Sequence, residues 1–313
     1  MTVLMAGCGD LGTEAGLRFA AAGHRVVGWR RSPDKLPAAI EGVRADLTTP
    51  PLPPIPEGTT AVVVAIAAGA PTEEGYRSAY VDGLSNVLDA LERDRKHDDG
   101  ALPTVALPSL VRRVLFVSST AVYGDAGGGW VDEGTTPEPG GFSGRIIREA
   151  EDLLQKRLLA TGITPVILRL GGIYGPGRTR LIDQVRSGLA VSPAEPRYTN
   201  RIHRDDAAAA IVHLCTMAAE PGPVYLGVDN DPAELGEVQR FLADELGLPL
   251  PASDGAAGGG GSGTGGSAGG EPSRGGNKRC SNALLRSTGF ELAYPTFREG
   301  YRAILAGEGV RHP

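Results

Sequence analysis

The segment TVLMAGCGDLG, residues 2–12, contains the most informative pattern in the chain. Its apolar residues 3–6 predict a buried strand, and residues 11–22 predict an amphipathic helix, with glycines at positions 7, 9 and 12. Between a strand and a helix, such glycines permit a tight turn, a close approach of the backbone to a pyrophosphate, and close helix packing. An ordinary glycine turn is the alternative. The predicted dinucleotide contacts come from Gly7, Cys8, Gly9, Asp10, Leu11 and Gly12.

Short apolar runs alternate with helical patterns along most of the chain. We expect strands at residues 3–6, 26–29, 61–66, 114–118, 166–170 and 224–228. We expect helices at residues 11–22, 76–94, 145–160, 181–187, 205–219, 234–246 and 296–305. Alternation of this kind is typical of a sheet covered by helices on both faces. The predicted fold class is therefore α/β, a doubly wound parallel Rossmann sheet with a smaller C-terminal α/β lobe.

The predicted domains are interleaved in sequence. Residues 1–174 and 205–228 are expected to form the NAD(P)-binding Rossmann domain, and residues 175–204 and 229–313 the substrate lobe. The proline-rich residues 50–56 and the segment 97–108 are expected to be loops. Residues 253–276 consist almost entirely of Gly, Ser and Ala and cannot bury apolar area, so we expect a disordered insert there.

Composition excludes several classes of protein. The 31 Lys and Arg residues against 37 Asp and Glu give a net charge of −6, which argues against nucleic acid as a partner. The longest apolar run, residues 61–70, is about half the length of a membrane span, and no basic segment precedes the first strand. We therefore expect a cytoplasmic protein without a membrane partner. Cys8, Cys215 and Cys280 lack the spacing of a metal site, so we expect reduced thiols and no metal.

The end of the second predicted strand bears on cofactor preference. Sites that prefer NAD usually place an acidic residue there, whereas this chain has Arg30, Arg31 and Ser32. Guanidinium groups pair with a 2′-phosphate, so the arginines favour NADP over NAD, the alternative being arginines that only face solvent. Further contacts are expected from Asp46 and Leu47 to the adenine, and from Ala67 and Ala68 to the nicotinamide half.

Hydroxyl side chains end a buried strand in the segment FVSSTAVYGD, residues 116–125. Ligands of open α/β sheets bind at the carboxyl ends of the strands. We therefore expect Ser118, Ser119 and Thr120 to face a ligand, with Ser118 beside the cofactor and the other two polarising a substrate oxygen. Hydroxyls that merely cap the strand end are the alternative.

The chain resembles the extended short-chain dehydrogenase/reductase superfamily, in its NAD-dependent epimerase/dehydratase branch and among that branch's atypical YeeZ-like members. The motifs that carry the resemblance are GCGDLG at 7–12, SSTAVYG at 118–124, RLGGIYGPGR at 169–178, NRIHRDDAAAA at 200–210 and NKRCSNALL at 277–285. The resemblance implies that Ser119 is the active-site hydroxyl and that Gly172 and Ile173 pass the nicotinamide. It also implies a small-molecule substrate and pairing of two copies through the helices at 76–94 and 145–160.

The chain departs from that family at the helix after the serine strand. The family presents a tyrosine and a lysine four residues apart there, and the lysine lowers the tyrosine pKa so that the phenolate can exchange a proton. This chain has Ser143 and Ile147 at the matching positions. The candidates for the missing acid or base are Tyr123, Tyr174 and His203, each with packing as the alternative role.

Two functions therefore stay open. One is an NAD(P)-dependent oxidoreductase or epimerase-like enzyme that acts on a hydroxyl or carbonyl of a sugar nucleotide or similar metabolite. The other is a catalytically silent protein that binds NADP(H) and reports redox state to a partner.

For Asp205 or Asp206, at the start of the predicted helix 205–219, we expect a role as the helix N-cap.

Overall fold

The computed structural model describes residues 1–98, 110–253 and 276–313 of the chain. A seven-stranded sheet in the order β11-β7-β5-β4-β1-β2-β3 forms its centre, and every neighbouring pair is parallel. The strand order reverses between β1 and β4, which is where α/β sheets bind ligands. The strands are β1 (Thr2–Ala6), β2 (Arg25–Arg30), β3 (Glu41–Arg44), β4 (Thr59–Val64), β5 (Arg113–Ser119), β7 (Thr164–Leu170) and β11 (Val224–Gly227). The predicted doubly wound Rossmann sheet is confirmed.

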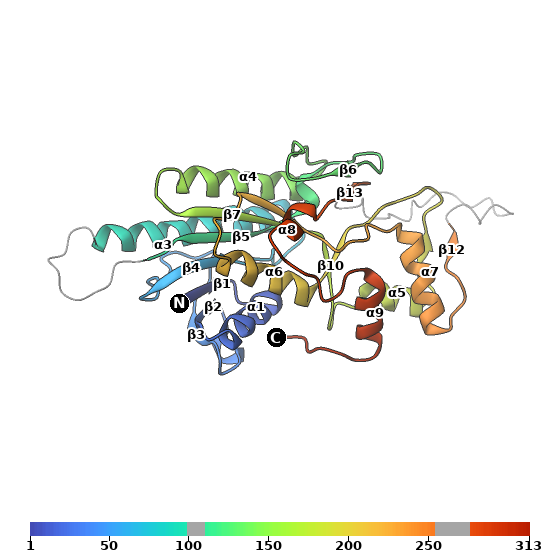
Figure 1. The fold of residues 1–313 in the computed structure, drawn as a ribbon, viewed down its shortest axis with the longest axis horizontal. Coiled ribbons are helices and arrows are strands. Elements are labelled where there is room, and N and C mark those ends of the chain that lie inside the picture. The colour runs from blue at the N-terminus through green and yellow to red at the C-terminus, as the bar shows by residue number, and fades with distance from the viewer. Residues whose placement is uncertain (99–109, 254–275) are drawn as a thin grey trace.

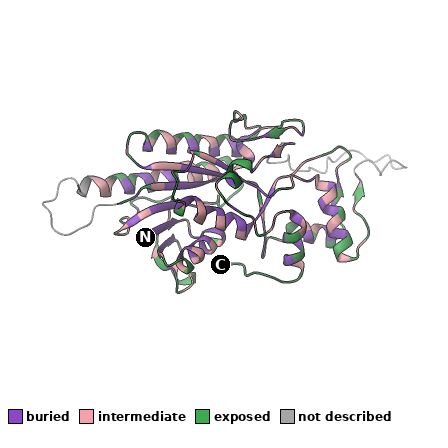
Figure 2. Ribbon diagram, viewed as in Figure 1, coloured by how far each residue is buried: buried purple, intermediate pink, exposed green. Residues whose placement is uncertain are grey.

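Helices cover both faces of this sheet, because alternate side chains of each strand point to opposite sides. On one face Val3 and Met5 of β1 pack in a core with α1 (Asp10–Ala21) and α6 (Arg204–Thr216). On the other face Leu4 and Ala6 pack with α3 (Gly83–Asp98) and α4 (Phe142–Leu158). Figure 1 shows the two layers on either side of the strands, and Figure 2 shows the strands as the buried centre of the molecule.

The span predicted as one helix, 76–94, is divided among three successive helical segments. α2 (Glu73–Tyr76) leads into a π-helical stretch, η2 (Arg77–Asp82), and then into α3. Short 3-10 turns follow β2 and β5, namely η1 (Pro33–Lys35) and η3 (Thr120–Val122). The second of these turns lies at the carboxyl end of β5, where the hydroxyl motif was predicted to meet a ligand.

A second body of structure lies beyond the carboxyl edge of the sheet (Figure 1). α5 (Arg180–Arg186), α7 (Leu235–Leu246) and α9 (Phe297–Leu305) share their own apolar core. Three short parallel pairs lie outside the central sheet: β8 (Gly172–Tyr174) with β10 (Arg201–His203), β9 (Val191–Ser192) with β12 (Ala252–Ser253), and β6 (Trp130–Val131) with β13 (Arg279–Cys280). α8 (Ala283–Ser287) follows β13. The role of this part in binding substrate stays a prediction.

Several boundaries differ from the predictions. The edge strand β3 was missed, because EGVR offers little apolar pattern in an exposed position. Residues 50–56 form neither helix nor strand. Most of the two other predicted irregular stretches, 97–108 and 253–276, lies outside the described residues, although residues 97 and 98 continue α3. No helix in the described part of the chain is long and apolar enough to cross a membrane.

Candidate functional site

The glycine turn between β1 and α1 has the geometry that its sequence predicted. Gly7 has φ +90°, and a Cβ atom there would lie 2.5 Å from the carbonyl oxygen of Ala65. A Cβ atom on Gly12 would lie 2.7 Å from the carbonyl oxygen of Gly7, whereas Gly9 faces open space. α1 begins at Gly9 without a side-chain cap, so its first N–H groups remain available to an anion.

A cavity of about 680 Å³ opens beside this turn. Nine of the predicted cofactor contacts line it: Gly7, Cys8, Gly9, Arg30, Arg31, Ser32, Asp46, Leu47 and Ala67. The cavity does not include four others, namely Asp10, Leu11, Gly12 and Ala68. Lys35 lines the same cavity and adds a third cation that the sequence pattern did not single out. The glycine turn and the residues predicted to bind a 2′-phosphate thus line the same cavity.

Asp46 and Arg30 are both held in defined positions at the end of this cavity. Two hydrogen bonds from Thr48 hold the pKa of the Asp46 carboxyl below its usual value. The Arg30 guanidinium donates to the carbonyl oxygen of Pro313 at 3.1 Å. Arg31 is exposed. A phosphate at this end would therefore meet the exposed guanidinium of Arg31, whose charge also acts on Asp46, and that of Arg30, which already has a backbone partner.

Asp10 turns toward other parts of the chain. Its carboxylate accepts from the guanidinium groups of Arg178 at 2.9 Å and Arg204 at 3.0 Å, and from the backbone N–H of His312 at 3.2 Å. Burial by itself raises the pKa of Asp10, but these hydrogen bonds and positive charges outweigh it and hold the pKa below its usual value. The negative charge at the start of α1 is thereby compensated by two arginines.

Residues 309–313, which we call the tail segment, lie across this region, and Figure 1 places them beside α1. The His312 imidazole lies 2.8 Å from the Glu14 carboxylate on α1, and the Arg311 guanidinium donates to the carbonyl oxygen of Gly177 at 3.0 Å. The Arg30 contact with Pro313 extends the tail segment to the nucleotide cavity. No sequence pattern pointed to these contacts.

A second cavity, of about 410 Å³, lies at the carboxyl ends of β5 and β7, and we call it the Ser119 cavity. Ser119 and Thr120 line one end of it, and Gly172, Ile173 and Tyr174 also border it. Ser119 caps the η3 turn, because its hydroxyl oxygen accepts from the backbone N–H of Ala121 at 3.1 Å. Ser119 therefore has the capping role given above as the alternative for these hydroxyls. This role uses only the oxygen as an acceptor, so the hydroxyl proton can still be donated to a ligand.

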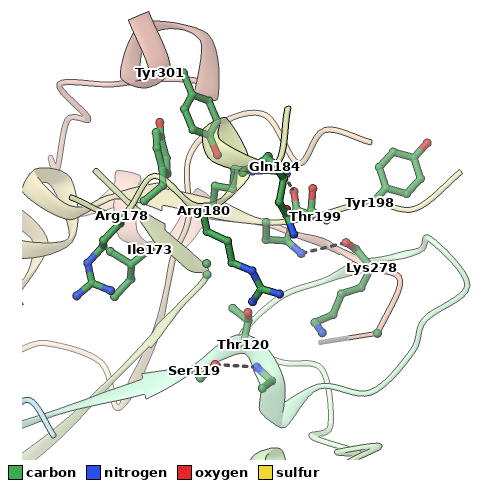
Figure 3. Close-up of a pocket in the computed structure, with 18 residues that line it drawn as sticks. Ser119, Thr120, Ile173, Arg178, Arg180, Gln184, Tyr198, Thr199, Lys278 and Tyr301 are labelled. Atoms are coloured by element: carbon green, nitrogen blue, oxygen red, sulfur yellow. Dashed lines mark hydrogen bonds between the residues drawn. The ribbon is translucent and has the colours of Figure 1, made fainter. Parts of the chain in front are cut away.

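Cations from three other segments line the Ser119 cavity. They are Arg178 and Arg180 around the start of α5, Arg201 of β10, and Lys278 just before β13. Figure 3 shows the Arg180 guanidinium and the Lys278 ammonium directed toward the end formed by Ser119 and Thr120. Sequence reasoning had not assigned Arg180, Arg201 or Lys278 to a site, although all three lie in or beside the motifs that carried the family resemblance.

The three candidates for the acid or base are enclosed. Tyr174 lines the Ser119 cavity, but burial raises the pKa of its phenol strongly. Tyr123 donates to the carbonyl oxygen of Asp132 at 2.7 Å, and burial raises its pKa to about 12. His203 is 2% exposed, and burial lowers the pKa of its imidazole to about 4. Tyr123 and His203 do not line the Ser119 cavity.

The expected N-cap of α6 was wrong. His203 occupies that position, and its Nδ1 accepts from the backbone N–H of Asp205 at 3.3 Å. Asp205 instead lies 2.6 Å from the Arg204 guanidinium, and Asp206 accepts from the backbone N–H groups of Ala293 and Tyr294. Because the His203 imidazole caps α6, the carboxylates of Asp205 and Asp206 are available to other partners.

α4 supplies the acidic member of a buried ion pair with Arg169 of β7. Ser143 and Ile147 are buried. Glu151 is fully buried, pairs with Arg169 at 2.6 Å and accepts from the Ser118 hydroxyl at 2.5 Å. Ser118 therefore turns to the helix side of the sheet and lines neither cavity. The Glu151–Arg169 ion pair, through the hydrogen bond from Ser118, holds the end of β5 that carries Ser119.

Comparison with known families adds an independent observation. A model of the NAD dependent epimerase/dehydratase family matches residues 3–227, which include the glycine turn, the Ser119 strand end and α4. The chain belongs to this family. The matched stretch of this epimerase/dehydratase chain ends at the last residue of β11, so Lys278 and the tail segment lie beyond it.

Individual relatives agree with this assignment. Protein YeeZ of Escherichia coli K12 is 38% identical over 120 residues, a match that covers 38% of this chain and only 41% of that protein. A structure from Methylobacillus flagellatus that is assigned to the NAD-dependent epimerase/dehydratases is 36% identical, with a TM-score of 0.72 and 98% of each chain covered. MoeE5 in complex with UDP-glucuronic acid and NAD is 19% identical, with a TM-score of 0.74 and 96% of each chain covered, and shows likeness of fold alone.

Proposed function

We propose that this chain binds NADP(H), or NAD(H) less tightly, beside the glycine turn and performs redox chemistry on a hydroxyl or carbonyl of a sugar nucleotide or similar metabolite. The observation that carries the proposal is that the nucleotide cavity and the Ser119 cavity lie next to each other at one edge of the sheet. Both lie at the carboxyl edge of the sheet, and the ion pair between Asp10, next to the glycine turn, and Arg178, in the Ser119 cavity, joins them. An elongated dinucleotide with a substrate at one end suits this arrangement.

The residues beside the glycine turn fit a dinucleotide. Gly7 and Gly12 leave no room for side chains, and the uncapped start of α1 presents N–H groups to a pyrophosphate. Arg30, Arg31 and Lys35 supply positive charge where an adenosine 2′-phosphate would lie, which supports the preference for NADP. When bound, the nicotinamide supplies a group that accepts or returns a hydride.

The Ser119 cavity fits an anionic substrate with a reactive oxygen. The hydroxyls of Ser119 and Thr120 can donate to that oxygen and polarise it. The guanidinium of Arg180 has no hydrogen-bond or ion-pair partner among the described residues and can pair with a phosphate. The sugar nucleotide in the MoeE5 structure, a protein of the same fold, supports this substrate class.

A catalytically silent NADP(H) sensor is the second candidate. The observation that favours it is the buried environment of Ser143, Ile147 and the three acid/base candidates, since none offers an exposed group of suitable pKa. The two functions make different predictions. The sensor binds oxidised and reduced nucleotide with different affinities and transfers no hydride, whereas the enzyme reduces NAD(P)+ with a substrate.

Cofactor preference is the first testable prediction. Replacing Arg30 and Arg31 together by Ala should weaken NADPH binding by about 1–3 kcal/mol and leave NADH binding nearly unchanged, because only NADPH carries the 2′-phosphate. Titration by nicotinamide fluorescence measures both affinities. Arg186→Ala, which removes an exposed arginine outside the nucleotide cavity, is the control and should change neither. Equal losses for the two nucleotides in the double variant would contradict the NADP preference.

Turnover distinguishes enzyme from sensor. Purified protein is incubated with NAD+ or NADP+ and a panel of sugar nucleotides that includes UDP-glucose and UDP-glucuronic acid, and reduced nicotinamide is followed by absorbance. Hydride transfer that is lost in Ser119→Ala supports the enzyme. Tight nucleotide binding without transfer across the panel supports the sensor, and failure to bind either nucleotide refutes both.

A further inference from the structure

Lys278 is a buried cation beside the reactive end of the Ser119 cavity. It is 1% exposed, yet it lines this cavity together with Ser119 and Thr120. Its segment is held firmly, because β13 pairs with β6 and the Asn277 side chain bonds to the backbone of Tyr198 and of Pro196. A lysine placed so rigidly presents its amine at one defined point.

The immediate partners of the amine are backbone carbonyls. Nζ donates to the oxygen of Tyr123 at 3.1 Å and to that of Gly124 at 3.5 Å, both in the motif that also carries Ser119. Among the described residues, no carboxylate lies within ion-pair distance of Nζ. A neutral amine has two N–H donors, which these carbonyls satisfy, and the remaining position on Nζ is a lone pair that can take a proton.

Burial favours the neutral form of this amine. It lowers the pKa of Lys278, while the charged forms of Cys280 and Asp125 act in the opposite direction. The other charged and titratable groups that share the cavity are Arg178, Arg180, Arg201, Tyr174, Tyr198 and Tyr301. The Arg180 guanidinium, directed toward the same end of the cavity, is a like charge and opposes a second cation there (Figure 3).

We propose that Lys278 exchanges the proton of the substrate's reacting oxygen beside Ser119, in place of a tyrosine and lysine at the α4 positions that Ser143 and Ile147 occupy. This inference rests on the enzymatic function proposed above. In the oxidising direction the substrate O–H bond breaks and its proton bonds to neutral Nζ. The electron pair left on oxygen forms the C=O bond as the C–H pair leaves as a hydride to the bound nicotinamide, and the reverse direction returns both.

The first test observes the amine itself in the intact protein. The chain has four lysines, Lys35, Lys96, Lys156 and Lys278, so [15N]lysine labelling gives few Nζ signals. The Lys278 signal is the one that remains when the other three are replaced by Arg. We expect it to titrate at lower pH than an ordinary lysine side chain, because burial lowers the pKa of Lys278, and to shift when NADP+ or NAD+ is added. A Lys278 signal that titrates at the ordinary lysine value, or that does not change with nucleotide, overturns the proposal.

The second test separates proton transfer from binding and folding. We expect Lys278→Met to lower kcat by about 10²–10⁴-fold with UDP-glucose or UDP-glucuronic acid. Its dissociation constant for NADPH should stay as in the wild type, and the limb of the pH–rate profile due to the amine should disappear. Lys278→Arg should not restore the rate, because a guanidinium does not release its proton. Lys156→Met, on the exposed face of α4, is the matched control and should keep the wild-type profile.

The outcomes distinguish this inference from the proposed function. A Lys278→Met variant that folds and keeps the wild-type rate and pH profile overturns the role of Lys278 and leaves the enzyme intact. A wild-type protein that binds no nucleotide, or that transfers no hydride, contradicts the enzymatic function instead. The Nζ titration then still decides whether the amine is poised to exchange a proton near a nucleotide.

Discussion

Asp229, two residues beyond the end of β11, is the buried carboxyl with the clearest consequence for stability. It is 2% exposed; one oxygen accepts from the backbone N–H of Asp231 at 3.1 Å, and the other has no hydrogen-bond partner among the described residues. Burial raises its pKa to about 8, although the Asp231 hydrogen bond and the charge of Arg201 oppose the shift. The folded protein therefore holds a proton on Asp229 at neutral pH.

This proton makes folding stability depend on pH. Because the pKa of about 8 in the folded state exceeds the ordinary value of 3.8, the folded state binds more protons than the unfolded state between these values. Its contribution to stability is present at low pH and is lost as the pH rises, by at most about 1.4 kcal/mol per pH unit. Asp229→Asn should flatten this slope in urea unfolding measured from weakly acidic to alkaline pH. The exposed Asp34→Asn is the control, and equal slopes in both variants would contradict the assignment.

At the scale of elements, Arg204 couples the starts of α6 and α1. It is 1% exposed and contacts three carboxylates, Asp205 at 2.6 Å, Asp10 at 3.0 Å and Glu14 at 3.6 Å. Arg18 contacts two of the same carboxylates from the surface, Glu14 at 2.8 Å and Asp205 at 3.8 Å, and its side chain is 38% exposed. The two arginines thus offer a matched comparison of a buried and an exposed partner.

We expect Arg204→Met to lower the free energy of unfolding by about 1.5–3 kcal/mol, because it removes a buried cation that donates hydrogen bonds to the partly buried carboxylates of Asp10 and Asp205. Arg18→Met should cost less than about 1 kcal/mol, since exposed ion pairs are screened by water. Chemical denaturation measures both. The Arg204→Met variant should also bind NADPH more weakly, because Asp10 then keeps only Arg178 as a counter-charge beside the glycine turn. Similar losses of stability in the two variants would show that burial is not the deciding factor.

The elements that could be predicted from the sequence are those that depend on residues close together in the chain. Gly7 specifies its turn through a positive φ, Gly7 and Gly12 allow close backbone contacts, and the apolar runs specify buried strands. Other features depend on partners far along the chain. His203 caps α6 because the β8–β10 pair positions its ring, and Lys278 reaches the Ser119 cavity because β13 pairs with β6. A lysine in NKRC carries no local sign of burial, so its place could not be predicted.

At the scale of the whole molecule, the tail segment competes for Arg30. One nitrogen of the Arg30 guanidinium donates to the backbone oxygen of Pro313, so that this donor is not available to a 2′-phosphate while the contact is present. Deleting residues 310–313 should therefore increase the preference for NADPH over NADH by about two- to tenfold, the worth of one hydrogen bond. Fluorescence titration of both nucleotides measures the ratio. In an Arg30→Ala background the same deletion should leave the ratio unchanged, and a gain that persists there would point to another cause.

The contacts of Asp10 also bear on how the chain is made. Asp10 emerges from a ribosome early, but Arg178, Arg204 and His312, which satisfy its carboxylate, follow by more than half of the chain. A nascent glycine turn therefore carries a negative charge at Asp10 that its two arginines cannot yet compensate, and the start of α1 acquires its final charge only after Arg204 has been synthesised.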